Sequence, residues 1–310
     1  MLRTPEGFRC AVSLTLIVAW AVTVGQPASA TAIPDLGMTA RTAALGDAFV
    51  GLGIGSDSLM LNPAGLAWNN GRSLISSIDV RRETASSGHV SATVGSVGLG
   101  VHYFDYGDVP EVDSTGNVIG SFEYREGFVV AGFGVPAQKL PFLSRLDAAR
   151  LLALGLCVKL LAADAGSLGN EGGWGIDVPL LIAKDMPLRR IPSITRASFG
   201  LCLRNLLSSS MDYNAGHANP WPKEVVIGGA IAVSDEWLVV VDLTSRQRTS
   251  VGVEYSPSSM LSLRAGLKQD RAWMWGFGIG LQANRLGVDL AAMVHRHLST
   301  QFRGTLYYAF

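Results

Sequence analysis

Residues 301–310 read QFRGTLYYAF, and their side chains alternate in character along the segment. One series of alternate positions holds Phe302, Gly304, Leu306, Tyr308 and Phe310. The positions between them include Gln301, Arg303, Thr305 and Ala309. A period of two is typical of a β-strand with one apolar and one mostly polar face. The segment therefore predicts a final strand that includes Phe310 itself.

The same alternation recurs through the second half of the chain. One apolar series consists of Leu261, Leu263, Ala265 and Leu267, and its intervening positions are Ser262, Arg264, Gly266 and Lys268. A second consists of Leu286, Val288, Leu290, Ala292 and Val294. The strands of a soluble β-sandwich also alternate, but their outer face is usually rich in lysine, glutamate, threonine and serine. Here the polar face is mainly glycine, serine and isolated charges, which suits an enclosed lumen and favours a transmembrane β-barrel.

The amino-terminal residues resemble an export signal. Arg3 and Arg9 precede a 15-residue apolar run over 11–25, and small residues at Ala28 and Ala30 form a cleavage site. The run is shorter than the roughly 20 residues that a transmembrane helix needs. We therefore predict a cleaved signal peptide over residues 1–30, with an uncleaved anchor as the alternative.

Composition excludes several classes of protein. Apolar residues make up 48% of the chain, charged residues only 16%, and the formal net charge is zero. The neutral net charge argues against nucleic-acid-binding proteins, which carry basic patches, and the 36 glycines argue against a helical bundle. We predict an all-β fold with no nucleic-acid partner.

Counting alternating segments gives fourteen strands, an even number as single-chain bacterial barrels require. The predicted strands are 73–81, 86–95, 96–106, 124–135, 150–163, 172–184, 195–205, 224–233, 236–246, 249–256, 259–269, 272–283, 285–295 and 299–310. With both ends on the periplasmic side, the longest connections, 107–123 and 206–223, are extracellular. Residues 117–125 either extend the fourth strand or form a separate hairpin.

The segment before the barrel has no period of two and is rich in glycine and alanine. Its stretches ARTAALGDAFVGLG (40–53) and DSLMLNPAGLA (57–67) resemble the amino-terminal signature of PorV/PorQ proteins and the wider FadL-like family. The resemblance implies a fourteen-stranded barrel in the outer membrane of a Gram-negative-type bacterium, with an amino-terminal hatch inside the lumen. We therefore divide the chain into a signal peptide (1–30), a hatch (31–72) and a barrel (73–310).

Six residues match the hatch motif of that family: Gly46, Asp47, Asn62, Pro63, Ala64 and Gly65. The last four form a compact turn on physical grounds as well. Proline has a fixed φ, an asparagine side chain can bond its own backbone, and a glycine can adopt a left-handed conformation. An ordinary surface turn is the alternative for such a tetrapeptide on its own.

The sequence shows no convincing catalytic or phosphate-binding motif, so we predict a non-enzymatic protein without cofactors. The resemblance leaves two functions open. FadL-type members pass hydrophobic molecules such as fatty acids through the barrel, whereas PorV-type members bind or shuttle exported proteins in type IX secretion. Most loops here are short, unlike the substrate-collecting loops of the transporters. His295 and His297 would share a strand face, so a metal site there is conceivable, but we assign none and expect no catalytic residues.

Seven charged residues belong to the predicted inward-facing series: Asp177, Arg204, Asp242, Glu254, Arg264, Asp289 and Arg303. One interpretation is that they pair across the lumen and hold the hatch, because an unpaired charge in a narrow space is costly. The other is that an arginine binds the carboxylate of a ligand through two parallel hydrogen bonds.

The final strand and the cysteines yield two further predictions. The alternate residues Phe302, Leu306, Tyr308 and Phe310 resemble the signal by which the barrel-insertion machinery recognises its substrates, so a tag after Phe310 should hinder insertion. Cys157 and Cys202 fall on strands separated by a third, about 9.6 Å apart at a spacing of about 4.8 Å per step. A disulfide needs Cα atoms within about 7 Å, so we predict two free, lumen-facing thiols.

Overall fold

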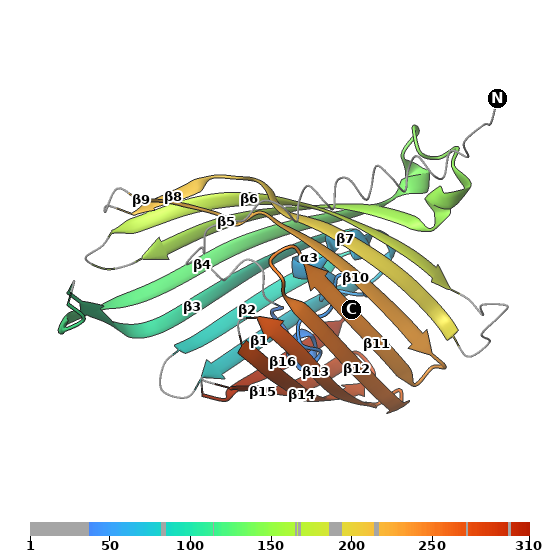
Figure 1. Ribbon diagram of the computed structural model, residues 1–310. Helices are drawn as coiled ribbons and strands as arrows, with labels where there is room; N and C mark the ends of the chain where they lie inside the picture. Colours follow the sequence, from blue (N-terminus) through green and yellow to red (C-terminus); the bar gives the residue numbers. More distant parts are fainter. Residues whose placement is uncertain are drawn as a thin grey trace.

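The computed structural model describes residues 37–81, 85–113, 115–164, 166, 169–185, 194–213, 217–270, 272–296 and 299–310. The predicted signal peptide and the first residues of the predicted hatch lie outside these ranges. Within them, fourteen strands close into an antiparallel barrel (Figure 1), which confirms the predicted fold class. The barrel strands are β1 Arg72–Arg81, β2 Ala85–Val94, β3 Val97–Val112, β4 Val118–Pro136, β5 Leu152–Asp164, β6 Asn170–Asp185, β7 Ile194–Ser208, β10 Glu224–Val233, β11 Trp237–Thr244, β12 Thr249–Ser258, β13 Leu261–Asp270, β14 Ala272–Ala283, β15 Leu286–His295 and β16 Gln301–Ala309.

The first and last strands complete the sheet. β1 pairs with β16 from Ser73↔Ala309 to Arg81↔Gln301. β7 pairs with β10, because β8 (Ser210–Tyr213) and β9 (His217–Pro220) form a separate two-stranded hairpin between them in the chain. In the described residues, closure leaves the barrel sheet without an unpaired edge, which is what a sheet needs to cross a bilayer.

The two ends of the barrel differ. At one end, which we call the terminal rim, the amide of Phe310 donates to the carbonyl of Arg72 (3.0 Å). Two short 3₁₀ helices also lie in the β4–β5 connection at this end, η3 (Ala137–Lys139) and η4 (Asp147–Arg150). The other end, the hairpin rim, carries the β3–β4 turn and the β8–β9 hairpin.

The wall also differs in height around the barrel. Strands β3–β7, the long wall, have 13 to 19 residues each. Strands β11–β16, the short wall, have 8 to 12. Figure 1 shows β3, β4, β5 and β6 extending well beyond the short wall at the hairpin rim.

The predicted connection over 107–123 is wrong in one respect, because most of it is strand. β3 continues to Val112 and β4 begins at Val118. After a register shift beyond Asp105, their pairing resumes at Asp108↔Glu123 and, past a second shift, ends at Val112↔Val118. Residues 117–125 therefore extend the fourth strand, since ladder hydrogen bonds satisfy their backbone better than an open loop would. The second predicted connection, 206–223, contains the β8–β9 hairpin and Trp221, which is buried.

The outer surface of the barrel is apolar. Leu263, Leu290 and Leu306 belong to the outward-facing series and are 44%, 55% and 53% exposed. Side chains of opposite parity face the lumen, as β-strand geometry requires. In the described ranges, none of the helices has the length and apolar character to span a bilayer.

Residues 37–71, the hatch, lie inside the barrel as the blue segment of Figure 1. The hatch contains two short α-helices, α2 (Ala40–Ala44) and α3 (Ser58–Leu61), and a 3₁₀ helix, η2 (Pro63–Trp68). Leu45, Phe49 and Leu66 are fully buried. Thr39 caps α2 by accepting from the amide of Thr42.

Glycines on the inner wall allow the hatch backbone to touch the strands directly. A Cβ built on Gly200 would lie 2.0 Å from the carbonyl oxygen of Val50, and one on Gly228 would lie 2.3 Å from the amide nitrogen of Gly51. The same holds for Gly134, Gly155, Gly252, Gly266 and Gly276. These seven residues form what we call the glycine seat. The polar face is rich in glycine because any side chain there would collide with the hatch.

Candidate functional site in the barrel lumen

Asn62 joins two parts of the hatch to each other and to the wall. It is completely buried. Its Nδ2 donates to the carbonyl of Val50 (2.6 Å) and to that of Leu180 in β6 (3.3 Å), while its Oδ1 accepts from the amide of Ala64 (3.2 Å). The side chain therefore satisfies a buried turn and fixes it against β6.

The rest of the NPAG turn packs without space to spare. Pro63 is the first residue of η2, and the amide of Ala64 approaches Gly155. A Cβ at Gly65 would lie 1.8 Å from the carbonyl oxygen of Gly53. Gly65 is not among the residues with positive φ, so the expectation of a left-handed glycine is wrong. Glycine is needed here because two hatch segments cross at contact distance.

Gly46 and Asp47 form the upstream turn, and both have left-handed backbones, with φ of 67° and 62°. A Cβ at Gly46 would also lie 2.8 Å from the carbonyl oxygen of Leu267 in β13. The carboxylate of Asp47 pairs with Lys268 of the same strand (2.8 Å). The turn therefore attaches the hatch to the short wall.

A second attachment centres on Glu254 of β12. Its Oε2 accepts from Nε of Arg264 (2.6 Å), while Arg41 of the hatch binds both of its oxygens at 2.9 Å. The other end of Arg264 pairs with Asp289 (2.8 Å). Asp57 of the hatch extends this network, because it lies 3.8 Å from Arg41 and accepts from the hydroxyl of Tyr307 (3.2 Å).

A third attachment lies where the barrel closes. Arg303 of β16 pairs with Asp79 of β1 and also donates to the backbone carbonyls of Gly37 and Thr39 in the hatch. Next to it, the hydroxyl of Thr305 accepts from the amide of Ala40 (2.8 Å). The start of the described hatch is thus held by the first and last strands together.

Asp242 has a different kind of partner. Its Oδ2 accepts from the amides of Phe49 (2.8 Å) and Val50 (2.9 Å) in the hatch. A buried carboxylate can be stabilised by backbone amides as well as by a cation. Asp242 therefore holds the hatch to β11 through backbone hydrogen bonds.

The remaining predicted charges lie beside the hatch, within the wall. Asp177 pairs with Lys159, which is fully buried (2.9 Å), and accepts from the amide of Asn205 (2.7 Å). Arg204 pairs with Glu224 (3.1 Å). Lys159 also lies 5.9 Å from the ring centre of Trp221, the residue that enters the lumen from the β7–β10 connection. These contacts extend the packed interior beyond the hatch.

All seven predicted charges are thus inside, and each of the three arginines has a carboxylate partner. Six of the charged partners just described were not among the predicted site residues: Arg41, Asp57, Asp79, Lys159, Glu224 and Lys268. Strand alternation could have found the last four, because they have inward parity on β1, β5, β10 and β13. The hatch has no period, so nothing in the sequence marks Arg41 or Asp57.

A row of aromatic side chains lines the inner face of β3 and β4 toward the hairpin rim. His102 lies 4.2 Å from Phe104 and 5.1 Å from Phe128 between ring centres. Phe104 lies 5.9 Å from Tyr106, which is 5.3 Å from Tyr124 of the facing strand. We call these five residues the aromatic ladder. Phe128 belongs to the hydrophobic core that contains Leu59 and Met60 of the hatch, and Phe104, Tyr106 and Tyr124 pack against that core.

A cavity of about 450 Å³, the vestibule, lies beside the hatch at the terminal rim. Its lining comes from the hatch and from β7 and β10–β12, and includes Arg41, Leu52, Ile54, Ala230, Leu238 and Glu254. The vestibule is therefore a space next to the Arg41–Glu254 pair, at the rim opposite the β3–β4 turn.

The remaining predicted residues are the two cysteines, the residues of the predicted insertion signal and the two histidines near the end of β15. Cys157 and Cys202 are buried and are not joined by a disulfide, as predicted. Phe302, Leu306, Tyr308 and Phe310 are 42% to 62% exposed on the outer face, and their role in insertion stays a prediction. His297 lies outside the described residues. Within the described ranges, no three metal-ligating side chains gather at one point.

Comparison with known proteins shows similarity only at the level of fold. No family model matches the chain, and no curated protein does. A mutant of the monoaromatic hydrocarbon channel TodX is 14% identical, with a TM-score of 0.49, over 88% of this chain and 97% of that one. A mutant porin of Rhodopseudomonas blastica is 12% identical, with a TM-score of 0.36, over 77% of this chain and 99% of that one. We infer no activity from likenesses this distant.

Proposed function

We propose that this protein is a carrier or passive channel for hydrophobic small molecules such as fatty acids, and that its hatch closes the lumen at rest. The aromatic ladder is the observation that carries the proposal. Apolar and aromatic linings with a few polar groups are typical of sites for small apolar ligands. The ladder provides such a lining from the hairpin rim down to the hatch. We assign the protein no enzymatic role.

The proposed location is the outer membrane of a Gram-negative-type bacterium. A closed, even-stranded barrel with an apolar outer face is the architecture of that membrane. The resemblance of the hatch sequence to PorV/PorQ and FadL-like proteins supports the same location. We place the terminal rim, where β1 begins and β16 ends, at the periplasm, and the hairpin rim, where β3–β6 project beyond the short wall, outside the cell.

Passage through the lumen requires the hatch to move. The glycine seat brings hatch backbone and wall into contact, which leaves no space for a ligand at that level. The Arg41–Glu254 pair borders the vestibule, so breaking it would join the vestibule to the space that the hatch occupies. We infer that a ligand descends the ladder and leaves through the vestibule after a rearrangement of the hatch around Arg41.

The lumen arginines are poorly placed to bind the carboxylate of a ligand. Arg204, Arg264 and Arg303 are each engaged by carboxylates of the protein itself. A fatty-acid carboxylate would have to displace one of these partners, leaving a buried carboxylate without its cation. We therefore propose that the apolar part of the ligand supplies most of the recognition.

The experiment compares two phenylalanines on opposite faces of the wall. Phe104 faces the lumen in the ladder, whereas Phe133 of β4 faces outward and is 43% exposed. In purified, detergent-solubilised protein, Phe104→Ala should weaken binding of a fluorescent fatty acid about tenfold or more, in line with the loss of a buried aromatic contact. Phe133→Ala should leave it unchanged. Equal binding by both variants would overturn the ladder as the binding surface.

A secretion role is the second candidate, and the tip of the β3–β4 hairpin favours it. Val112, Val118 and Ile119 are 56%, 68% and 62% exposed there. Exposed apolar side chains beyond the barrel are a surface that an exported protein could cover. Gentle purification followed by lipid mass spectrometry and proteomics separates the two roles. A bound fatty acid supports transport, whereas stoichiometric secreted proteins support secretion.

A further inference from the structure

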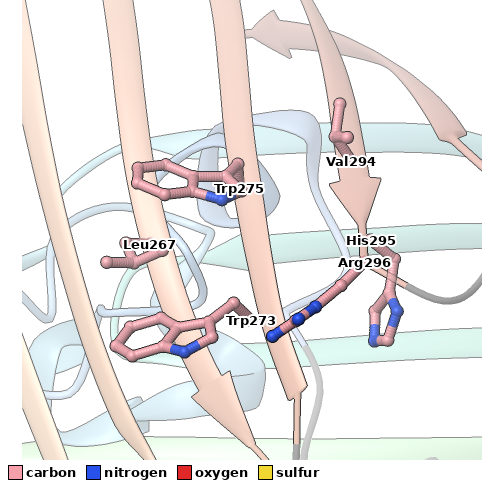
Figure 2. Close-up of a pocket in the computed structure, with 6 residues that line it drawn as sticks. All are labelled: Leu267, Trp273, Trp275, Val294, His295 and Arg296. Atoms are coloured by element: carbon pink, nitrogen blue, oxygen red, sulfur yellow. The ribbon is translucent and has the colours of Figure 1, made fainter.

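A groove of about 480 Å³ runs along the outer face of the barrel at the hairpin rim, across β13, β14 and β15. Its apolar floor consists of Leu267, Trp273, Trp275 and Val294, and Arg296 lies at its end (Figure 2). Trp273 and Trp275 are 44% and 50% exposed. Because the groove lies on the membrane-facing surface, it is separate from the lumen and from the function proposed above.

The groove is ordered from polar to apolar along the strands. At the rim, Trp273 is paired with Gln269, and its carbonyl accepts from the amide of Arg296. One row deeper in the membrane, Trp275 is paired with both Leu267 and Val294. Figure 2 shows the Arg296 side chain directed toward Trp273, while Trp275 lies farther along the strand. A membrane lipid has the same order, with a polar headgroup at the surface and chains beneath it.

We propose that this groove binds one phosphorylated lipid of the outer leaflet, with an acyl chain across the two tryptophans and a lipid phosphate at Arg296. A groove of this size matches the volume of sites that hold a small molecule. Tryptophan is suited to the boundary between headgroups and chains. A guanidinium can bind phosphate through two parallel hydrogen bonds, which makes Arg296 the residue that selects an anionic headgroup.

The test measures tryptophan quenching by brominated lipids in reconstituted vesicles. One series contains brominated phosphatidylglycerol and the other brominated phosphatidylcholine, each in a phosphatidylcholine background. The wild-type barrel should favour the anionic lipid, and Arg296→Gln should reduce that preference about fivefold, the effect expected of one basic residue near a membrane surface. Arg296→Lys should retain most of it. Trp275→Phe should remove part of the quenching by both lipids.

Arg285 is the matched control, because it is an exposed arginine in the β14–β15 turn at the opposite rim. Arg285→Gln makes the same change of charge and should leave the preference intact. The proposal is overturned if wild type shows no preference, or if Arg285→Gln and Arg296→Gln behave alike. It is also overturned if native mass spectrometry shows a second copy of the chain and the tryptophans are shielded from both lipids.

Discussion

The short wall and the upper part of the long wall meet the lumen in opposite ways. Along the short wall, glycines such as Gly252, Gly266 and Gly276 bring the hatch backbone against the strands. Along the upper part of the long wall, large side chains such as Phe104 and Tyr106 project inward instead. One region is built for contact between two pieces of backbone. The other presents side-chain surface that is only partly buried, which is what a ligand requires.

The difference separates what closes the lumen from what lines it. Charged groups on the short wall bind hatch residues, as in the pairs Arg41 with Glu254 and Asp47 with Lys268. The aromatic ladder meets the hatch through apolar packing, because most of its members belong to or pack against the core that contains Leu59 and Met60. Substitutions on the short wall should therefore affect stability and hatch closure, and those in the ladder should affect ligand binding.

The largest effect is expected at Arg264, whose side chain is only 7% exposed and joins Glu254 to Asp289. Arg264→Met leaves Asp289 without this cation, and removing one member of a buried pair costs about 3–5 kcal/mol. We expect a clear fall in the midpoint of unfolding, which is measured by the change in gel mobility between folded and unfolded protein. Exposed Arg285→Met is the control. Lost fatty-acid binding at unchanged stability would instead show that Arg264 serves the ligand.

A smaller effect is expected from adding one methyl group to the glycine seat. A Cβ added to Gly228 would lie 2.3 Å from the amide nitrogen of Gly51. A Cβ added to its neighbour Gly229 would have nothing within 4 Å. Gly228→Ala should destabilise the closed state by about 1–3 kcal/mol, as overpacking does. Because the hatch is displaced, planar-bilayer recordings should show more frequent opening.

Gly229→Ala is the matched control for this substitution, since it adds the same methyl group to the next residue on the outer face. Its unfolding midpoint and its conductance should match those of the wild type. If the two alanine variants behave alike, contact with the hatch is not what requires glycine at 228.

The smallest effect is expected at the β3–β4 turn, far from the hatch. Asp113 accepts from the amides of Thr115 and Asn117 and from the hydroxyl of Thr115. These bonds, the one from the Thr115 hydroxyl foremost, lower the pKa of Asp113 to about 2. A carboxyl with a depressed pKa in the folded state stabilises above its unfolded pKa of about 3.9, and the contribution is lost as the pH falls through the folded value.

Pepsin nicking across pH 2–4 provides the measurement for Asp113. The wild-type turn should become more susceptible as the pH falls toward about 2, where Asp113 takes up a proton. Asp113→Ala should be susceptible throughout, with the unfolding midpoint of the barrel unchanged. A variant as protected as the wild type at pH 4 would show that the turn does not depend on this carboxylate.

Alternation by itself determined most of the fold. It placed Leu263 and Leu306 outside and Arg264 and Arg303 inside, because successive side chains of a strand face opposite ways whatever surrounds them. It also predicted the number of strands. It could not settle where the β3 and β4 strands end, since their extension depends on pairing between Asp108 and Glu123, which only the register decides.

Only the tertiary structure decided what each inward residue touches. The sequence placed Arg264 in the lumen, but its link to Arg41 through Glu254 joins residues more than two hundred positions apart. From the sequence alone, Gly65 is interpreted as a flexible turn residue. Glycine is required there because the chain crosses itself at Gly53 and leaves no room for a side chain. Local patterns determine the direction in which a side chain points. The identity of its partner depends on how the hatch lies in the closed barrel, and that is settled by packing between segments that are distant in the sequence.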